Sequence, residues 1–348
     1  MVSQYSTIFA KDISVIYDMY DNVYPIERSI KQYNPISADG IQNLLNEVNN
    51  ANERIMPINW TAVSQSFTPS TTYSICYGNG KFIAVSDYNR MGYSTDGITW
   101  TAISQNILKD TILTVCYGNG KFIAGESGPG YMAYSTDGIT WTRVPQSIFM
   151  NDVQTVYSIC YGNEKFVAVG GNATIAYSTD SINWITVLES SGSGYPFRGH
   201  IRSVCYGNEK FVAVGDYGSM GYSTDSTTWK ASQSFTANHI YSICYGNGKF
   251  VAGGYKGSMG YSTDGINWTA ISPSFTTSDV RSIYYGNGKF VAVGYNGSMG
   301  YSTDGINWTA ISQSFTTRNI QSVCYGNGKF IVGGAGGSMV YSQTGLSL

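Results

Sequence analysis

The chain has 348 residues, of which 12% are charged, 41 are Gly and 29 are Tyr, and its formal net charge is −2. A disordered chain would be more charged and poorer in aromatic residues, and a protein that reads DNA or RNA would carry a basic stripe, so we expect neither. No apolar run approaches the roughly 18 residues of a membrane span, and the first residues lack a basic segment ahead of an apolar core. We therefore expect no membrane span, no signal peptide and folding in the cytoplasm.

Residues 1–58 form a segment of their own, because they contain no copy of the repeat that fills the rest of the chain. Apolar residues recur at helical spacing before Pro25 and again over residues 37–55, which predicts a small helical segment. Two interpretations stay open. The helices pack on the flank of the following domain, or they form an attachment or oligomerisation arm that makes a homo-oligomer possible.

From residue 59 to 348 one sequence unit recurs. The block Y-G-N-[GE]-K-F begins at Tyr77, Tyr117, Tyr161, Tyr206, Tyr245, Tyr285 and Tyr325. The block Y-S-T-D begins at Tyr93, Tyr134, Tyr177, Tyr222, Tyr261 and Tyr301, with a decayed copy at Tyr341. Each unit has four strand-like runs, which in the sixth are 281–286, 289–294, 298–302 and 307–312. Four short strands in a repeat of about 40 residues predict one blade of a β-propeller.

The two ends of this region complement each other. The last repeat stops at Leu348 without its fourth strand, while the W-T-A run at Trp60 has no preceding strands. We therefore predict an all-β, seven-bladed propeller over residues 59–348, closed by strand 59–64, which completes the last blade and removes the open edges.

The turn S-T-D-G-x-[NT]-W, as in 302–308, resembles the Asp-box of sialidases and other propeller proteins, but it is one residue shorter between Asp and Trp. In that family the box is a structural hairpin whose Asp caps backbone donors. Ser and Asp fold onto nearby N–H groups in such turns, and a turn repeated in every blade is a poor candidate for one catalytic site. We predict a structural role for it.

The cysteines occupy one slot of the first strand in six repeats, at Cys76, Cys116, Cys160, Cys205, Cys244 and Cys324. Sheets of neighbouring blades pack about 10 Å apart, whereas a disulfide requires Cα atoms within about 7 Å. Metal ligation is also disfavoured, because no C-x-x-C spacing is present. We predict buried free thiols, no metal and no cofactor.

An enzyme is the less favoured interpretation. A glycosidase usually needs two positioned carboxylates, and residues 59–348 contain only four glutamates, at 126, 164, 189 and 209. Arg202 and Arg281 share a slot of the first strand, but no third arginine joins them, as a sialidase would require. The two histidines, His200 and His239, have no nucleophile elbow nearby.

The repeats differ in two connections of each blade, which strand alternation places on one rim, opposite the Asp-box-like turns. Loops on a rigid scaffold commonly bind ligands. Between the second and third strands the candidates are Asp87, Tyr88, Arg90, Tyr131, Asn172, Asp216, Tyr217, Tyr255, Lys256, Tyr295 and Asn296. Between blades they are Arg198, His200, His239, Arg281 and Arg318. Tyrosines beside polar residues suit sugars, because aromatic rings stack on C–H faces while polar groups bind hydroxyls.

These features predict a multivalent, lectin-like binding module that gains avidity from several weak sites. The chain resembles propeller-type bacterial lectins. The sequence of its repeat also resembles proteins encoded beside tail genes of phages and phage-tail-like bacteriocins of Gram-positive bacteria. That resemblance implies a receptor-binding protein of a virion or tailocin released by lysis. Residues 1–58 would bind a tail or baseplate protein, and the propeller would bind a cell-surface glycan or cell-wall polymer. The alternatives are a protein–protein scaffold and, less favoured, a divergent glycosidase.

Overall fold

The structure is a computed structural model that describes residues 59–64, 66–104, 107–145, 155–187, 195–273, 275–311 and 316–342. The predicted helical segment 1–58, with its attachment or oligomerisation role, lies outside these residues. Among the described residues, no helix has the length and apolar character that crossing a bilayer requires.

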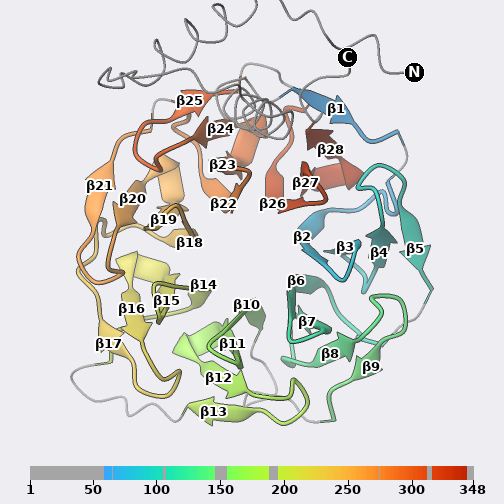
Figure 1. Ribbon diagram of the computed structural model, residues 1–348, viewed down its shortest axis with the longest axis horizontal. Helices are drawn as coiled ribbons and strands as arrows, with labels where there is room; N and C mark the ends of the chain where they lie inside the picture. The colour runs from blue at the N-terminus through green and yellow to red at the C-terminus, as the bar shows by residue number, and fades with distance from the viewer. Residues whose placement is uncertain are drawn as a thin grey trace, which may run out of the picture. The chain divides into compact units, whose positions relative to one another are not determined.

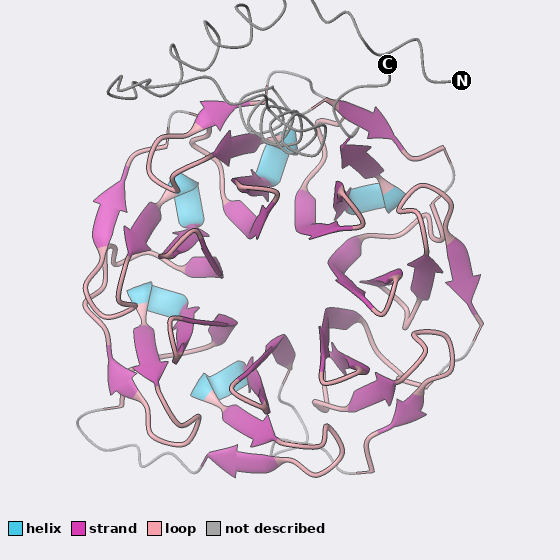
Figure 2. Ribbon diagram, viewed as in Figure 1, coloured by secondary structure: helices cyan, strands magenta, loops and turns pink. Residues whose placement is uncertain are grey.

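Seven four-stranded antiparallel sheets surround a central axis as the blades of a propeller (Figure 1). Six blades take four consecutive strands each, from blade 1 (β2–β5) to blade 6 (β22–β25), and blade 7 combines β26, β27 and β28 with β1. Figure 2 shows short 3₁₀ helices at five of the connections between second and third strands. The predicted all-β, seven-bladed fold is therefore confirmed.

Each blade contributes one strand at each distance from the axis. The innermost strands are β2 (Thr72–Gly78), β6 (Ile112–Gly118), β10 (Val156–Gly162), β14 (Ile201–Gly207), β18 (Ile240–Gly246), β22 (Val280–Gly286) and β26 (Ile320–Gly326). The second strands are β3 (Lys81–Ser86), β7 (Lys121–Glu126), β11 (Lys165–Gly170), β15 (Lys210–Gly215), β19 (Lys249–Gly254), β23 (Lys289–Gly294) and β27 (Lys329–Gly334).

The outer half of each blade is shorter. The third strands are β4 (Met91–Ser94), β8 (Met132–Ser135), β12 (Ile175–Ser178), β16 (Met220–Ser223), β20 (Met259–Ser262), β24 (Met299–Ser302) and β28 (Met339–Ser342). The outermost strands are β5 (Thr101–Ile103), β9 (Thr142–Arg143), β13 (Ile185–Val187), β17 (Lys230–Ala231), β21 (Thr269–Ile271), β25 (Thr309–Ala310) and β1 (Trp60–Ala62). The 3₁₀ helices are η1 (Gly171–Ala173), η2 (Asp216–Gly218), η3 (Tyr255–Gly257), η4 (Tyr295–Gly297) and η5 (Ala335–Gly337).

The ring closes as the sequence predicts. Strand β1 pairs antiparallel with β28, so that Trp60 lies opposite Ser342 and Ala62 opposite Val340, and the two strands lie side by side in Figure 1. The N–H of Val63 adds a hydrogen bond to the carbonyl of Met339 at 2.9 Å. The closing strand is shorter than the predicted 59–64, because regular pairing ends at Ala62.

The hydrophobic core lies between neighbouring blades. Phe122 of blade 2, for example, is fully buried in one cluster with Ile83 of blade 1. At the seam between blades 7 and 1, a Cβ on Gly326 would lie 2.1 Å from Cγ of Tyr77. The Gly of each Y-G-N block therefore leaves room for the Tyr ring of the next blade, which explains why the repeat keeps both residues.

The Ser-Thr-Asp turns have the predicted structural role. In blade 6, Asp304 Oδ1 accepts the backbone N–H groups of Ile306 and Asn307 at 2.8 Å each, and Ser302 Oγ accepts the N–H of Gly305 at 2.9 Å. Both side chains are thus occupied in holding the turn.

All six cysteines are free thiols, as predicted; Cys244 and Cys324 are buried, whereas the other four are half-buried rather than fully buried. Burial raises the pKa of Cys116 and of Cys324 to about 12. These thiols are therefore un-ionised at neutral pH and behave as small apolar side chains.

Candidate functional site

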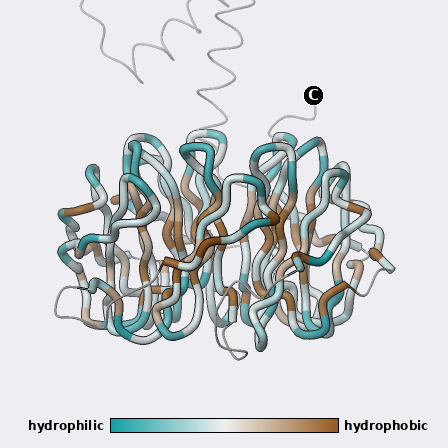
Figure 3. Tube along the Cα trace, turned by 90° about the horizontal axis from the view of Figure 1, so that it is seen from below, coloured by the Kyte–Doolittle hydropathy of each residue, from teal (hydrophilic) through white to brown (hydrophobic). Residues whose placement is uncertain are grey.

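The propeller has two rims of different character. The first, here the turn rim, carries the Y-G-N and S-T-D turns, which are linked across blades: Asn79 Nδ2 donates to the carbonyl of Thr136 at 3.3 Å, and Asn208 Nδ2 to that of Thr263 at 3.2 Å. The opposite edge, here the variable rim, carries the connections in which the repeats differ. In a side view, hydrophilic residues gather at both rims and hydrophobic residues lie between them (Figure 3).

The turns between second and third strands are tight and left-handed. In blade 4 the N–H of Ser219 donates to the carbonyl of Asp216 at 3.0 Å, and the two central residues, Tyr217 and Gly218, have φ of 56° and 69°. This is a type I′ turn, which favours Asn and Gly at its centre. The equivalent first central residues are Tyr88, Asn172, Lys256, Asn296 and Gly336.

Two of these turns carry a tyrosine where the backbone disfavours one. Tyr88 and Tyr217 both have φ of 56°, and their side chains are 72% and 66% exposed. A bulky residue in the left-handed region costs about 1–3 kcal/mol, and burial does not offset that cost here. Turn geometry disfavours both rings, although each makes a contact on the rim: the Tyr217 centroid lies 5.0 Å from that of His239, and the Arg90 guanidinium lies 5.3 Å from the Tyr88 centroid.

Residues that precede the innermost strands support the turns of the preceding blade. The backbone N–H of Asn172 donates to His200 Nδ1 at 3.2 Å, and that of Lys256 to Asp279 Oδ1 at 3.0 Å. In the same way the N–H of Asn296 donates to Asn319 Oδ1 at 3.2 Å. The residue that precedes each innermost strand differs between blades, and part of this difference therefore serves the fold, since His200 accepts a hydrogen bond from the turn of blade 3.

A β-bulge re-aims one residue of every innermost strand. The register shifts between Val280 and Ser282 in blade 6, and at the same place in each other blade. Bulges commonly redirect a side chain beside a functional site. The bulged residues are Tyr73, Leu113, Tyr157, Arg202, Tyr241, Arg281 and Gln321. They differ from blade to blade, whereas the rest of the strand is nearly constant.

Asp216, which is buried, forms a network with the partly exposed Arg202 and His239 between blades 4 and 5. Arg202 donates from Nε to Asp216 Oδ1 at 2.8 Å and from Nη2 to Oδ2 at 3.2 Å. His239 Nδ1 lies 3.0 Å from Oδ1, closer than the 3.4 Å that separates it from the N–H of Tyr217, which favours donation to the carboxylate. Burial raises the pKa of Asp216, but the hydrogen bond and charge of Arg202, the N–H of His200 and the charge of His239 together lower it by more, so the carboxyl is ionised.

Tyrosine rings join this network to blades 3 and 6. The Arg202 guanidinium lies 4.6 Å from the ring centroid of Tyr157, and His239 stacks on Tyr241 with centroids 6.3 Å apart. Arg281 lies 4.3 Å from the Tyr241 centroid and 5.1 Å from that of Tyr295. We call this continuous set the inner arc. It consists of Tyr157, Arg202, Asp216, His239, Tyr241, Arg281, Tyr295 and Gln321.

Of the other predicted residues, Tyr217 and His200 adjoin the arc: the Tyr217 ring lies 5.0 Å from that of His239, and the His200 ring lies 5.5 Å from that of Tyr157. On blade 1, the guanidinium of Arg90 lies 5.3 Å from the Tyr88 ring, and Asp87 accepts the N–H of Thr71 at 3.3 Å. Tyr255 meets His239 edge-on at 6.4 Å, so it flanks the arc.

Two predicted arginines are exposed on the connections between blades, Arg198 before blade 4 and Arg318 before blade 7. Tyr131 lies in the connection between β7 and β8, which belongs to the variable rim like those of the other candidates. Its ring is half-buried and lies under Arg143 of the outermost strand β9, at 3.6 Å, where it packs on the core between blades 1 and 2.

Sequence reasoning missed Tyr73, Tyr157, Tyr241 and Gln321, and it used the shared slot of Arg202 and Arg281 only to argue against a sialidase. A signal was present, because aligned repeats show this slot to be the variable position inside an otherwise constant strand.

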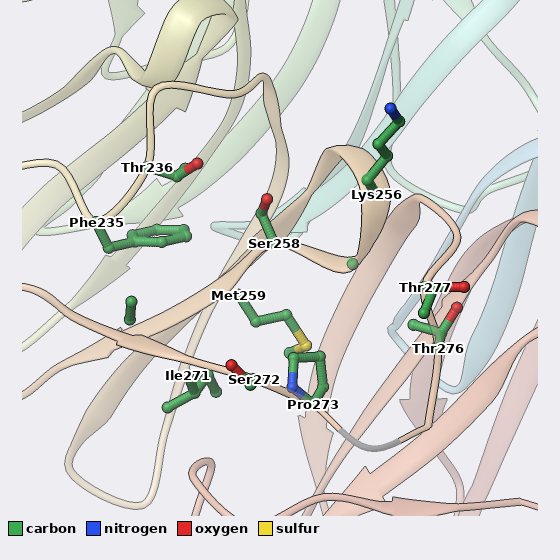
Figure 4. A pocket seen from close by; sticks show the side chains of 12 residues that line it. Phe235, Thr236, Lys256, Ser258, Met259, Ile271, Ser272, Pro273, Thr276 and Thr277 are labelled. Carbon is green, nitrogen blue, oxygen red and sulfur yellow. The ribbon is translucent and has the colours of Figure 1, made fainter.

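Two grooves lie outside the arc, on either side of the connection between blades 5 and 6. Their volumes are about 350 and 410 Å³. In Figure 4, Lys256 of the first groove extends away from Met259 and Pro273, with Thr276 and Thr277 on the facing connection. The grooves enlarge the surface that a long ligand would contact.

Candidate catalytic groups are few in the described part of the chain. Glu126 is fully buried, its Oε2 accepts the N–H groups of Lys109 and Asp110, and burial raises its pKa. It supports a loop and is closed to a substrate. Across the described ranges, no group of three or more His, Cys, Asp or Glu side chains is placed to hold a metal ion.

Comparisons with known proteins bear on the fold. No protein-family model matches the chain, and no curated protein matches it. Among solved structures, YCF48 from Cyanidioschyzon merolae is 19% identical with a TM-score of 0.64, over 82% of this chain and 98% of that one. A structure described as YCF48 bound to D1 peptide is 17% identical with a TM-score of 0.63, over 83% and 97%. A catalytically inactive virginiamycin B lyase from Staphylococcus aureus, with quinupristin, is 12% identical with a TM-score of 0.72, over 82% and 99%. The chain is thus similar to propellers with different ligands, and the likeness is one of fold alone.

Proposed function

We propose that this propeller is a non-catalytic carbohydrate-binding protein whose variable rim contacts the glycan. Tyr88 and Tyr217 carry the proposal, because both rings are exposed on left-handed backbone that they make less stable. Residues held in sparsely populated backbone regions cluster at functional sites. A flat, exposed ring with a hydroxyl suits the apolar face of a sugar.

The inner arc supports the same proposal. It holds tyrosine rings, two guanidinium groups and the amide of Gln321 on bulged positions of rigid strands. Rigid strands hold such groups with little loss of side-chain freedom on binding. The tips on blades 1 and 4 and the arc would engage one polysaccharide at several points, which raises avidity.

Because of the resemblance of its repeat sequence, we further propose that the protein belongs to the tail of a phage or tailocin. Residues 1–58 would bind a tail or baseplate protein, and the ligand would be a cell-surface glycan or cell-wall polymer. An antibody against the chain should then label tail tips of particles released by lysis. If the antibody labels only protein that is not attached to particles, the tail assignment is contradicted, whereas the carbohydrate proposal is unaffected.

Tyr88→Asn and Tyr217→Asn test the carbohydrate proposal without damaging the fold. Asn is favoured in the left-handed region, so each variant should be at least as stable as the parent while glycan binding falls. On an array of glycans and cell-wall polymers, the double variant should lose signal at the positions that the parent binds. Ile185→Asn, which removes an exposed apolar side chain from strand β13, is the control and should bind as the parent does.

Peptide binding is the second candidate, because a solved structure of this fold is described as bound to a peptide. A parent protein that binds no glycan or cell-wall polymer at high avidity, but does bind peptides through Tyr88 and Tyr217, would replace the carbohydrate proposal with this one. Turnover of a fluorogenic glycoside by the parent protein would overturn the non-catalytic part of the proposal.

A further inference from the structure

Arg202 and Arg281 occupy the same bulged slot, two blades apart, but their surroundings differ in one residue. Facing Arg202, the first position of the tight turn is Asp216, which forms a bidentate ion pair with the guanidinium. Facing Arg281, the same turn position is Tyr295, whose ring lies 5.1 Å from the guanidinium. The charge of Arg202 is therefore neutralised within the protein, and that of Arg281 lacks the matching partner.

The contacts of Arg281 leave most of its donors available. Its Nε donates to Gln321 Oε1 at 3.3 Å, and its faces lie against Tyr241 and Tyr295. Within the described residues, no carboxylate oxygen lies within 4.0 Å of its nitrogens. Asp279, two residues before it, uses Oδ1 to accept the backbone N–H of Lys256 at 3.0 Å.

The variable rim also carries an exposed cation on each side of blade 6 in the chain order. Lys256 is exposed on the turn of blade 5, and Arg318 is exposed on the connection that precedes blade 7. Ring contacts hold the guanidinium plane in place, and a fixed guanidinium with free N–H groups fits a carboxylate or phosphate in a bidentate manner.

We propose that Arg281 is the anchoring contact for an anionic group, a carboxylate or a phosphate, on the carbohydrate that the variable rim binds. This inference rests on the proposed function and names the ligand class as an acidic saccharide. Blade 6 alone combines the bulged arginine with a turn that lacks aspartate in the facing position, so a short acidic ligand should bind with one site per chain.

Calorimetry on the full chain tests the proposal with three probes: trigalacturonate, a short glycerol-phosphate oligomer and neutral maltotriose. Comparison of trigalacturonate with the glycerol-phosphate oligomer shows whether Arg281 prefers a carboxylate or a phosphate. We expect an acidic probe to bind once per chain and more weakly as salt rises, because salt screens partly exposed charges. Arg281→Gln should weaken that binding about 10-fold, as expected for loss of a charge-assisted hydrogen bond. Lys230→Gln, which removes a charge from the outermost strand β17, should leave it unchanged.

Tyr295→Asp provides a test that keeps Arg281. It recreates in blade 6 the pairing that Asp216 makes in blade 4, so acidic binding should fall as in Arg281→Gln. Tyr295→Asn removes the same ring without adding charge and should retain more acidic binding than Tyr295→Asp.

The outcomes separate the two proposals. Unchanged acidic binding in Arg281→Gln, or equal binding of Tyr295→Asp and Tyr295→Asn, overturns the anionic anchor. Binding of maltotriose alone by the parent overturns the anchor and leaves the carbohydrate proposal standing. If the parent binds neither these probes nor any glycan on the array, the proposed function fails and the anchor fails with it.

Discussion

Replacing Asp304 by Asn should destabilise the propeller at neutral pH and have a much smaller effect in acid. Burial raises the pKa of the Asp304 carboxyl, but the N–H groups of Asn307 and Ile306 and the side chains of Asn307 and Ser302 lower it by more, from 3.8 to about 2. That change corresponds to about 2 kcal/mol of stability. We expect roughly half of it, about 1 kcal/mol, because the turn is partly exposed and solvent screens the interaction.

The direction of the pH dependence follows from which state binds the proton first. As the pH falls, the unfolded chain, with its ordinary Asp pKa of 3.8, is protonated before the folded one. The stabilisation is therefore complete above this pKa and is lost as the pH falls towards 2. The equivalent residues with lowered pKa are Asp96, Asp137, Asp180, Asp225 and Asp264. The whole ring should lose stability over the same interval.

Urea unfolding of the parent and Asp304→Asn, at about pH 6.5 and about pH 2.5, measures the effect. The difference in unfolding free energy should shrink in acid to roughly a third of its neutral value. Thr303→Ala, in the same turn, removes no titrating group and should give the same difference at both pH values. A destabilisation by Asp304→Asn that is equal at both pH values would refute the assignment of the turn's stability to the ionised carboxylate.

Three further predictions concern packing and the closing seam. Gly326→Ala should destabilise the propeller by about 2 kcal/mol in denaturant titrations, because its Cβ would lie 2.1 Å from Tyr77 Cγ; a change below about 0.5 kcal/mol would contradict that contact. Trp60→Ala should cost about 3–5 kcal/mol, since this side chain of the closing strand is 3% exposed; an unchanged unfolding midpoint would show that blade 7 does not need it. The thiols of Cys116 and Cys324, whose pKa values are about 12, should resist maleimide at about pH 8 until urea unfolds the chain. Fast labelling of the native protein would show that they are accessible and ionised.

Local and repeated features of the fold could be read from the sequence. The Asn-Gly and Ser-Thr-Asp turns depend on backbone conformations and hydrogen bonds within a few residues, as the bonds of Asp304 to Ile306 and Asn307 show. The closing role of the strand at Trp60 could be deduced by counting strands, since the repeat specifies four for each blade. The candidate binding residues on the rim, such as Tyr88, Tyr217 and Arg281, could be proposed because copies of one repeat reveal the positions at which they differ.

The chemistry of the candidate site was decided by contacts that cross from one blade to the next. Asp216 and His239 are 23 residues apart and belong to different blades, and nothing in either repeat alone indicates that they meet. The bulge at Arg281 arises from pairing with the second strand, so the residues of one strand alone do not reveal it.

The sequence by itself thus determined the blade, its turns, the number of blades and the way the ring closes, because hydrogen bonds and hydrophobic contacts repeat with the sequence unit. Only the tertiary structure decided that Arg202 is neutralised by Asp216 while Arg281 lies between two tyrosine rings. The physical reason is that the free energy of a charge depends on the groups within a few ångströms of it, and those groups are set by packing across the blades.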